Sequence, residues 1–179
     1  MLDILSKFEN YEIETDYIRL PNVNISKEQK ELVGLKESDS NSKFLRQLCY
    51  KGFEKKLQKK QIDAKKSQKY IDQIKFELDT FDELYFTDYI LLVWLVIQKA
   101  KEQNIFIDYG RGSVVSSCVS WLLEITGVDP IKYNLFFSRF VSKTRSKSKI
   151  IDGQIWLKKD LIPDADLILG EAREKIIEW

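Results

Sequence analysis

The sequence predicts an α+β fold in which several helices pack on a small mixed sheet. Long amphipathic or apolar segments indicate helices over residues 42–57, 65–81 and 87–103. Alternating polar and apolar residues indicate short strands at residues 11–15, 17–20 and 163–169. Between these groups, a β-rich segment at 105–108 leads through a glycine turn into an apolar helical segment at 114–125. This order of elements divides the chain into a strand and linker region, 1–41, and one main domain, 42–179.

Local signals predict where several of these elements begin and end. The first strand region ends at Pro21, and the polar residues 27–41 are expected to form a connection. Thr87 or Asp88 is suited to cap the helix that runs to about residue 103. Asp129 and Pro130 supply an N-cap and a first helical position, which predicts a helix through Phe140.

Composition excludes several classes of site. The chain of 179 residues has no histidine, which removes histidine zinc sites, histidine bases and serine or cysteine triads. Its two cysteines, Cys49 and Cys118, are expected to be buried free thiols, which favours a cytoplasmic location. The longest apolar run, 89–97, is too short to span a membrane.

The net charge of +1 hides two basic stretches. Residues 51–69 hold eight basic and two acidic side chains, and residues 143–159 hold six basic and one acidic. Such runs are usually solvated surfaces, because lysine-rich helices need no partner to be stable. Near a phosphate-binding site, the second stretch is also suited to contact DNA or a triphosphate.

The glycine turn is the most informative feature of the chain. In the segment Tyr109-Gly-Arg-Gly-Ser113, the turn points backbone N–H groups outward at the positive end of the following helix, where phosphate oxygens bind. Ser113 is placed to act as N-cap or to donate to a ligand. A turn of this kind is also common as a tight connection between a strand and a helix.

Motifs on both sides of the turn carry a family resemblance. They are Tyr70-x6-Glu77-Leu78, Tyr89-Ile-Leu-Leu-Val-Trp94, Ile125-Thr-Gly-Val-Asp129-Pro130, Tyr133-Asn-Leu-Phe136 and Arg139-Phe140. In this order they closely resemble the first half of the palm of bacterial C-family replicative DNA polymerases, the polymerase III alpha subunits. The resemblance implies an incomplete palm of the polymerase-beta-like nucleotidyltransferase fold.

The same resemblance indicates a pair of catalytic carboxylates. The family motif Pro-Asp-x-Asp-x-Asp-Phe is matched by Pro163-Asp-Ala-Asp-Leu-Ile-Leu169, with Ile168 in place of the third aspartate. In a strand Asp164 and Asp166 lie on one face, where both can bind metal ions. An insertion, Ser146–Ile162, precedes the motif and leaves two alternatives open: Asp152 as the motif residue, or a solvated segment without function.

The resemblance implies template-directed nucleotidyl transfer with two Mg²⁺ ions held by Asp164 and Asp166 in a complete palm. The residues it assigns to the phosphates of a deoxynucleoside triphosphate are Gly110, Arg111, Gly112, Ser113, Arg139 and Arg145. The expected partners are primer-template DNA and a second polypeptide with the remaining palm, thumb and fingers, through which a sliding clamp could be reached; no membrane is expected.

Because the family's last metal-binding carboxylate follows the thumb, this chain alone is expected to be inactive. The expected location is the cytoplasm of a bacterium or of a phage-infected host. Two other functions are compatible with the sequence: an inactive polymerase-derived structural or DNA-binding subunit, and an unrelated basic helical protein that binds nucleic acid.

Overall fold

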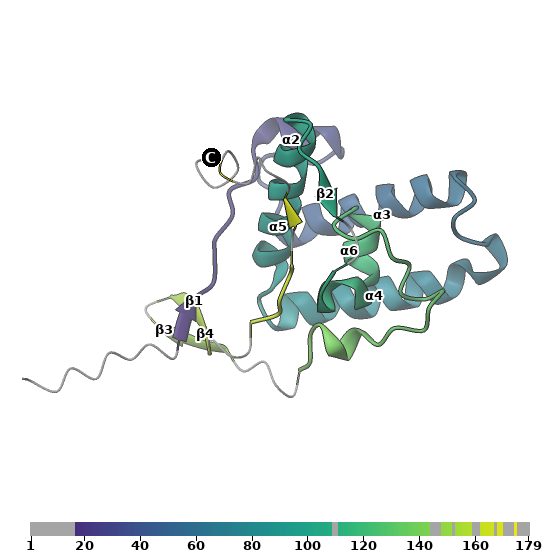
Figure 1. Ribbon diagram of the computed structural model, residues 1–179. Coiled ribbons are helices and arrows are strands. Elements are labelled where there is room, and N and C mark those ends of the chain that lie inside the picture. The colour runs from purple at the N-terminus through teal and green to yellow at the C-terminus, as the bar shows by residue number, and fades with distance from the viewer. Residues whose placement is uncertain are drawn as a thin grey trace, which may run out of the picture.

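Three long helices form the frame of the fold. The computed structural model describes residues 17–108, 111–143, 148–151, 153–158, 162–166, 168–169 and 174. Helices α3 (Asn41–Gln58), α4 (Ser67–Glu83) and α5 (Thr87–Glu102) follow the predicted segments to within two residues at either end, and their arrangement is shown in Figure 1. On α4 the buried residues Tyr70, Ile74, Leu78 and Phe81 recur at helical spacing, so one apolar stripe faces the core. The α+β class is therefore confirmed.

The predicted caps of α5 are wrong, because both residues serve other segments. The helix begins after Phe86, without a side-chain cap. The Thr87 hydroxyl donates to Oδ1 of Asp82 at 2.7 Å. The Asp88 carboxylate accepts from the backbone N–H of Val23 at 3.0 Å and from the side-chain amide of Asn41 at 2.8 Å. Asp88 thereby holds the N-terminal segment against the start of α3.

The segment expected to be a connection contains a helix, α2 (Lys27–Leu32). Ser26 and Gln29 form a capping box, in which each side chain accepts from the other residue's backbone N–H. Lys30 is buried, and its ammonium group donates to two backbone carbonyls, at Glu37 and Asp39. These bonds fold the polar segment back on itself and explain why it is ordered as a short helix rather than an open linker.

The helix predicted from Asp129 to Phe140 does not form. The Asp129 carboxylate does accept from the backbone N–H groups of Ile131 and Lys132, both at 3.0 Å, as an N-cap would. The chain then leaves the helical path at Asn134, whose φ of 50° belongs to the left-handed region. Only a 3₁₀ turn, η3 (Phe137–Arg139), follows.

The strands form two small antiparallel sheets in the described residues, so the predicted single mixed sheet is wrong. In the first sheet β4 (Gln154–Lys158) lies between β1 (Tyr17–Arg19) and β3 (Ser148–Ile151). In the second sheet β2 (Ile107–Asp108) pairs with β5 (Ile168–Leu169). The first sheet lies to one side of the helices in Figure 1. The predicted strand at 11–15 lies outside the described residues.

The predicted insertion, Ser146–Ile162, contains the β3–β4 hairpin. Because β1 pairs with β4, contacts cross the predicted boundary between residues 1–41 and the main domain. Ile18 lies opposite Leu157, whose side chain is fully buried. The inserted hairpin is therefore folded and forms a sheet with the N-terminal strand β1. The division at residue 41 stays a prediction.

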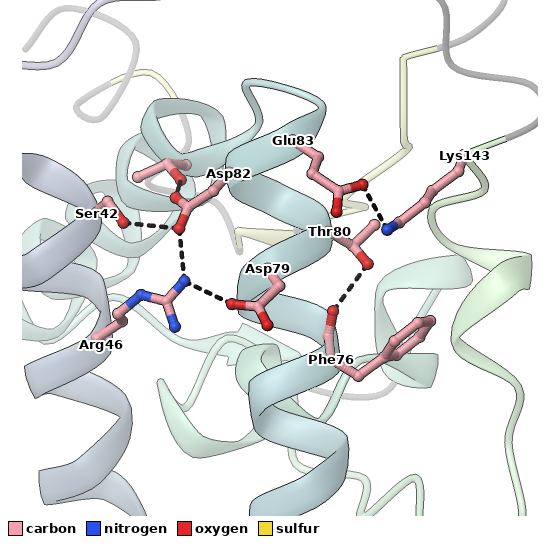
Figure 2. Close-up of polar contacts among 9 residues, drawn as sticks. Ser42, Arg46, Phe76, Asp79, Thr80, Asp82, Glu83 and Lys143 are labelled. Atoms are coloured by element: carbon pink, nitrogen blue, oxygen red, sulfur yellow. Dashed lines mark hydrogen bonds and ion pairs between the residues drawn. The ribbon is translucent and has the colours of Figure 1, made fainter.

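A polar cluster joins α3, α4 and the start of α5 (Figure 2). One guanidinium nitrogen of Arg46 donates to Asp79 at 2.8 Å and to Asp82 at 2.6 Å. Asp82 also accepts from the Ser42 hydroxyl at 2.8 Å. Burial alone would raise the pKa of Asp82, but the hydrogen bonds, that from Arg46 first, lower it below its usual value. On the other side of α4, Glu83 pairs with Lys143, which precedes the hairpin.

Two cysteines lie in the core. Cys49 and Cys118 are buried free thiols, as predicted, and burial raises the pKa of each thiol far above its usual value. In the described part of the chain, no helix is long and apolar enough to cross a membrane.

Candidate functional site

The glycine turn lies directly against the aspartate segment. Gly112 has φ 75° and ψ −175°, a conformation that is open almost only to glycine. A Cβ placed on Gly112 would lie 2.9 Å from Oδ2 of Asp166 and 3.1 Å from its Cβ. The backbone conformation therefore favours glycine here, and the Asp166 side chain lies where a Cβ would be placed.

Ser113 contacts the same segment but is not the N-cap that was predicted. It opens a 3₁₀ helix, η2 (Ser113–Ser116), for which Gly112 occupies the cap position. The Ser113 hydroxyl donates to the backbone carbonyl of Asp164 at 3.1 Å. The capping role falls to Ser117, whose hydroxyl accepts from the backbone N–H of Ser120 at the start of α6 (Cys118–Leu122).

The aspartates lie in a segment without regular secondary structure rather than in the predicted strand. Among the described residues of 163–169, Ile168 and Leu169 alone are in a strand, β5. The Tyr89 hydroxyl on α5 donates to the carbonyl of Pro163 at 2.5 Å, just before the first aspartate. Burial raises the pKa of the Tyr89 hydroxyl to about 12, and the charges of Asp164 and Asp166 act in the same direction.

The pairing of β5 with β2 brings this segment back to the turn. The register places Ile107 opposite Leu169 and Asp108 opposite Ile168. The β3–β4 hairpin therefore does not separate Asp164 and Asp166 from Gly112. Asp152, the alternative motif residue, falls between β3 and β4 and outside the described residues.

Of the arginines predicted to bind phosphate, Arg111 lies beside the aspartates and Arg139 lies on a separate element. Arg111 Nε lies 3.9 Å from Oδ2 of Asp166, and the two side chains are 65% and 52% exposed, so the ion pair is open to solvent. Arg139 is exposed on η3, which packs against η2. Gly110 and Arg145 lie outside the described residues.

The two carboxylates fit the ligand preference of Mg²⁺. Among the described residues, no group of three acidic or sulfur-containing side chains forms a complete metal cage. Mg²⁺ is usually held by one or two carboxylates together with waters and substrate phosphates. Asp164 and Asp166 are both exposed beside a turn that can carry phosphate, and so they suit an ion that arrives with its substrate.

Comparison with known proteins decides the family. Residues 43–156 match the family model described as the bacterial DNA polymerase III alpha NTPase domain. The chain belongs to the DNA polymerase III alpha family. It is 37% identical over 140 residues to the DNA polymerase III subunit alpha of Ureaplasma parvum, covering 78% of this chain and 13% of the relative.

Other polymerase III alpha subunits agree. Identity is 34% over 143 residues with the subunit of Campylobacter jejuni and 33% over 132 residues with that of Bacillus subtilis. These alignments cover 80% and 73% of this chain, and 11% of each relative. The chain thus spans about a tenth of the length of the polymerase III alpha subunits that it matches. The family model ends before Asp164, so the contacts with Gly112 and Ser113 are what link the aspartates to the turn.

Glu77 lies near this site, and its motif, Tyr70-x6-Glu77-Leu78, did not by itself predict a role for it. It lies in the middle of α4, and its side chain is completely buried. Its carboxylate accepts four hydrogen bonds, from the Gln73 amide, the Ser117 hydroxyl and the backbone N–H groups of Cys118 and Val119, at 2.8 to 3.0 Å. Burial raises its pKa against these bonds, which favour the ionised form.

In this member of the family, Glu77 fixes the segment that carries the turn. It binds the N-terminal end of α6, and the Ser117 N–H donates in turn to the Val114 carbonyl, one residue after Ser113. A signal for this role was present in the sequence. A glutamate within the apolar stripe of α4 must find buried donors, and an N-terminal helix end supplies them.

Proposed function

We propose that the chain is the first half of a polymerase palm and contributes to template-directed transfer of nucleotides from triphosphates to a primer 3′-hydroxyl. Membership of the polymerase III alpha family supports a part in DNA replication. The activity needs a second polypeptide, or a missing C-terminal part, that carries the rest of the palm, the thumb and the fingers. A sliding clamp would be reached through that part.

Each residue of the site has a role in this proposal. The backbone N–H groups of Gly112 and Ser113 bind phosphate oxygens of the incoming nucleotide, with Gly110 completing the turn. Arg111, Arg139 and Arg145 offer guanidinium donors, which pair well with phosphate. Asp164 and Asp166 hold Mg²⁺, which when bound lowers the pKa of the primer hydroxyl and neutralises the phosphates.

One observation carries the proposal more than any other. The hairpin inserted before the aspartates returns the chain so closely to the turn that a Cβ on Gly112 would lie 2.9 Å from an Asp166 oxygen. The amides that we propose to bind phosphate and the carboxylates that we propose to bind metal thus lie on neighbouring segments, which supports a site for in-line phosphoryl transfer. Neither feature alone would support more than a tight turn or a solvated loop.

Primer extension tests the proposal. The purified chain with Mg²⁺ should not extend a primer, because two carboxylates without thumb and fingers cannot position primer, template and nucleotide together. Added to a polypeptide carrying the remaining domains, it should restore extension. Asp164→Asn or Asp166→Asn should reduce the restored rate by at least about 100-fold, since loss of a metal ligand removes several kcal/mol of transition-state stabilisation.

Asp72→Asn is the matched control, because it removes one exposed carboxylate from α4. It should leave the restored rate unchanged. If both site variants extend primers as fast as the parent, Asp164 and Asp166 do not hold the metal. Failure of every mixture to extend, with DNA binding retained, would favour the other function, an inactive polymerase-derived structural or DNA-binding subunit.

A further inference from the structure

The turn between α3 and α4 carries an unusual concentration of positive charge. We define the lysine tip as five exposed lysines in and beside this turn: Lys59, Lys60, Lys65, Lys66 and Lys69. Within the described residues, none of their ammonium groups is paired with a carboxylate. Elsewhere the chain pairs some of its surface cations, for example Lys43 with Asp39, and Lys55 with Glu124. In Figure 1 the tip lies at the opposite end of the molecule from the three-stranded sheet.

The backbone of the tip is well anchored. Ile62 is only 3% exposed and packs into the core. Asp63 accepts from the backbone N–H of Lys65 at 3.0 Å, and the Ser67 hydroxyl donates to the Ala64 carbonyl at 2.8 Å. The lysines therefore project from a fixed frame, which lowers the entropy lost when they bind a ligand.

The helix dipoles favour a cation at only one of these lysine positions. Lys59 lies at the C-terminal end of α3, where the helix dipole favours a cation. Lys65, Lys66 and Lys69 lie at the N-terminal end of α4, where the dipole disfavours cations and where the first turn has no acidic residue and no side-chain cap. Three cations are thus held where they reduce the stability of the helix.

The positive field also acts on a neighbouring residue. Lys56 lies beneath the tip, with its ammonium group 4.6 Å from the centre of the Trp121 ring. Burial lowers the pKa of Lys56, and the charges of Lys59 and Lys55 lower it further, although Glu124 opposes them. Of the tip lysines, Lys59 therefore adds to the positive charge that Lys56 meets, and Asp129 acts against it together with Glu124.

We propose that the lysine tip binds the phosphate backbone of duplex DNA. Closely spaced phosphates on a duplex match several fixed cations, and release of condensed counterions drives such binding. Proteins that prefer single strands add aromatic side chains for base stacking, and residues 59–69 contain none. The inference rests on the proposed function only in that DNA is the polyanion this chain would meet. It adds a contact surface on α3 and α4, outside the glycine turn and the aspartates.

Binding of a random-sequence duplex of about 20 base pairs, measured by fluorescence anisotropy from about 50 to 200 mM NaCl, tests the inference. The tip variant replaces four lysines by glutamine, at Lys60, Lys65, Lys66 and Lys69. A control variant makes the same charge change outside the tip and outside residues 143–159, at Lys27, Lys36, Lys43 and Lys75, which are all exposed. Both are made in the full chain.

The tip variant should bind at least about 10-fold more weakly at 100 mM NaCl, with a salt slope shallower by about 3 to 4, whereas the control should change less than about threefold. The melting temperature of the tip variant should equal or exceed that of the parent, because cations have been removed from the N-terminal end of α4. Lysines that served only the fold would give the opposite change in melting temperature.

Three results would overturn the inference: no binding of the duplex by the parent chain, equal losses in the two variants, or a single-stranded oligonucleotide bound more tightly than the duplex through the same lysines. None of these depends on metal or nucleotide. The tip can therefore bind duplex DNA even if primer extension is not restored, and primer extension can be restored even if the tip does not bind. The two experiments thus test the two proposals independently.

Discussion

Glu77 and the aspartate segment contact opposite ends of one stretch of chain. The Glu77 carboxylate binds the start of α6, whereas the Asp164 carbonyl and the Asp166 side chain lie against the glycine turn. Glu77 is fully buried and accepts four hydrogen bonds from protein donors. Asp164 and Asp166 are exposed, and in the described residues their carboxylates have only the open contact between Asp166 and Arg111. A carboxylate such as Glu77, whose oxygens accept hydrogen bonds within the protein, stabilises the fold. Exposed carboxylates such as Asp164 and Asp166 remain available to bind a ligand.

The comparison predicts that the effect of removing a carboxylate on stability falls as its exposure rises. Glu77→Ala should lower the free energy of unfolding by about 3–5 kcal/mol, because the buried donors at Ser117, Cys118 and Val119 lose their acceptor. Urea unfolding measures the change. Glu83→Ala, which removes only a surface ion pair on the same helix, should lower it by less than about 1 kcal/mol. Equal effects would show that Glu77 is not an anchor.

Asp82 is an intermediate case, with a side chain that is 33% exposed. Asp82→Ala removes the acceptor for Ser42, Arg46 and Thr87 and should lower the free energy of unfolding by about 1–2 kcal/mol, measured as above. In a double-mutant cycle with Arg46→Ala the two losses should not add, since both variants break the same contact. Additive losses would show that the contact between Asp82 and Arg46 does not contribute to stability.

Glu124 extends the comparison to the pH dependence of stability. Burial would raise its pKa, but hydrogen bonds from Lys101 and Lys55 outweigh burial and lower the pKa from 4.5 to about 2. A pKa lowered by folding stabilises the folded state above about pH 4.5, and that stability is lost as the pH falls towards 2. Since the group is partly exposed, screening reduces the contribution to about 1 kcal/mol. Glu124→Gln should flatten this part of the stability profile, and an unchanged profile would contradict the assignment.

The smallest effects are expected at the site itself. Asp164→Asn and Asp166→Asn should change the free energy of unfolding by less than about 0.5 kcal/mol, because both side chains are exposed. Thermal unfolding without metal is the measurement. A loss above about 2 kcal/mol in either variant would mean that the carboxylates serve the fold, as Glu77 does.

The sequence predicted the elements that depend on one local pattern. Helices α3, α4 and α5 follow from their apolar periodicity. The family resemblance implied that the glycine turn and the aspartates belong to one site. The capping box of Ser26 and Gln29 is also a local pattern, but residues 27–41 were predicted to be a connection, so that prediction missed α2.

Features that depend on tertiary contacts were not predictable in this way. Asp129 has the sequence of an N-cap and makes the bonds of one, yet Asn134 turns the chain away before a helix forms. Ser113 and Ser117 are equally suited to cap a helix, and only the 3₁₀ turn between them decides for Ser117. Which donors Glu77 meets depends on how α6 packs on α4, some 40 residues along the chain.

The central claim, that the glycine turn and the two aspartates form one nucleotide site, is tested most directly by an amide NMR titration of the full chain with a deoxynucleoside triphosphate and Mg²⁺. The backbone signals of Gly112 and Ser113 should shift together with those of Asp164 and Asp166, with a dissociation constant of about 1 mM, roughly −4 kcal/mol. The Mg²⁺-dependent part of the shift should be lost in Asp166→Asn. Shifts confined to the lysine tip, with Gly112 and Asp166 unchanged, would contradict the claim.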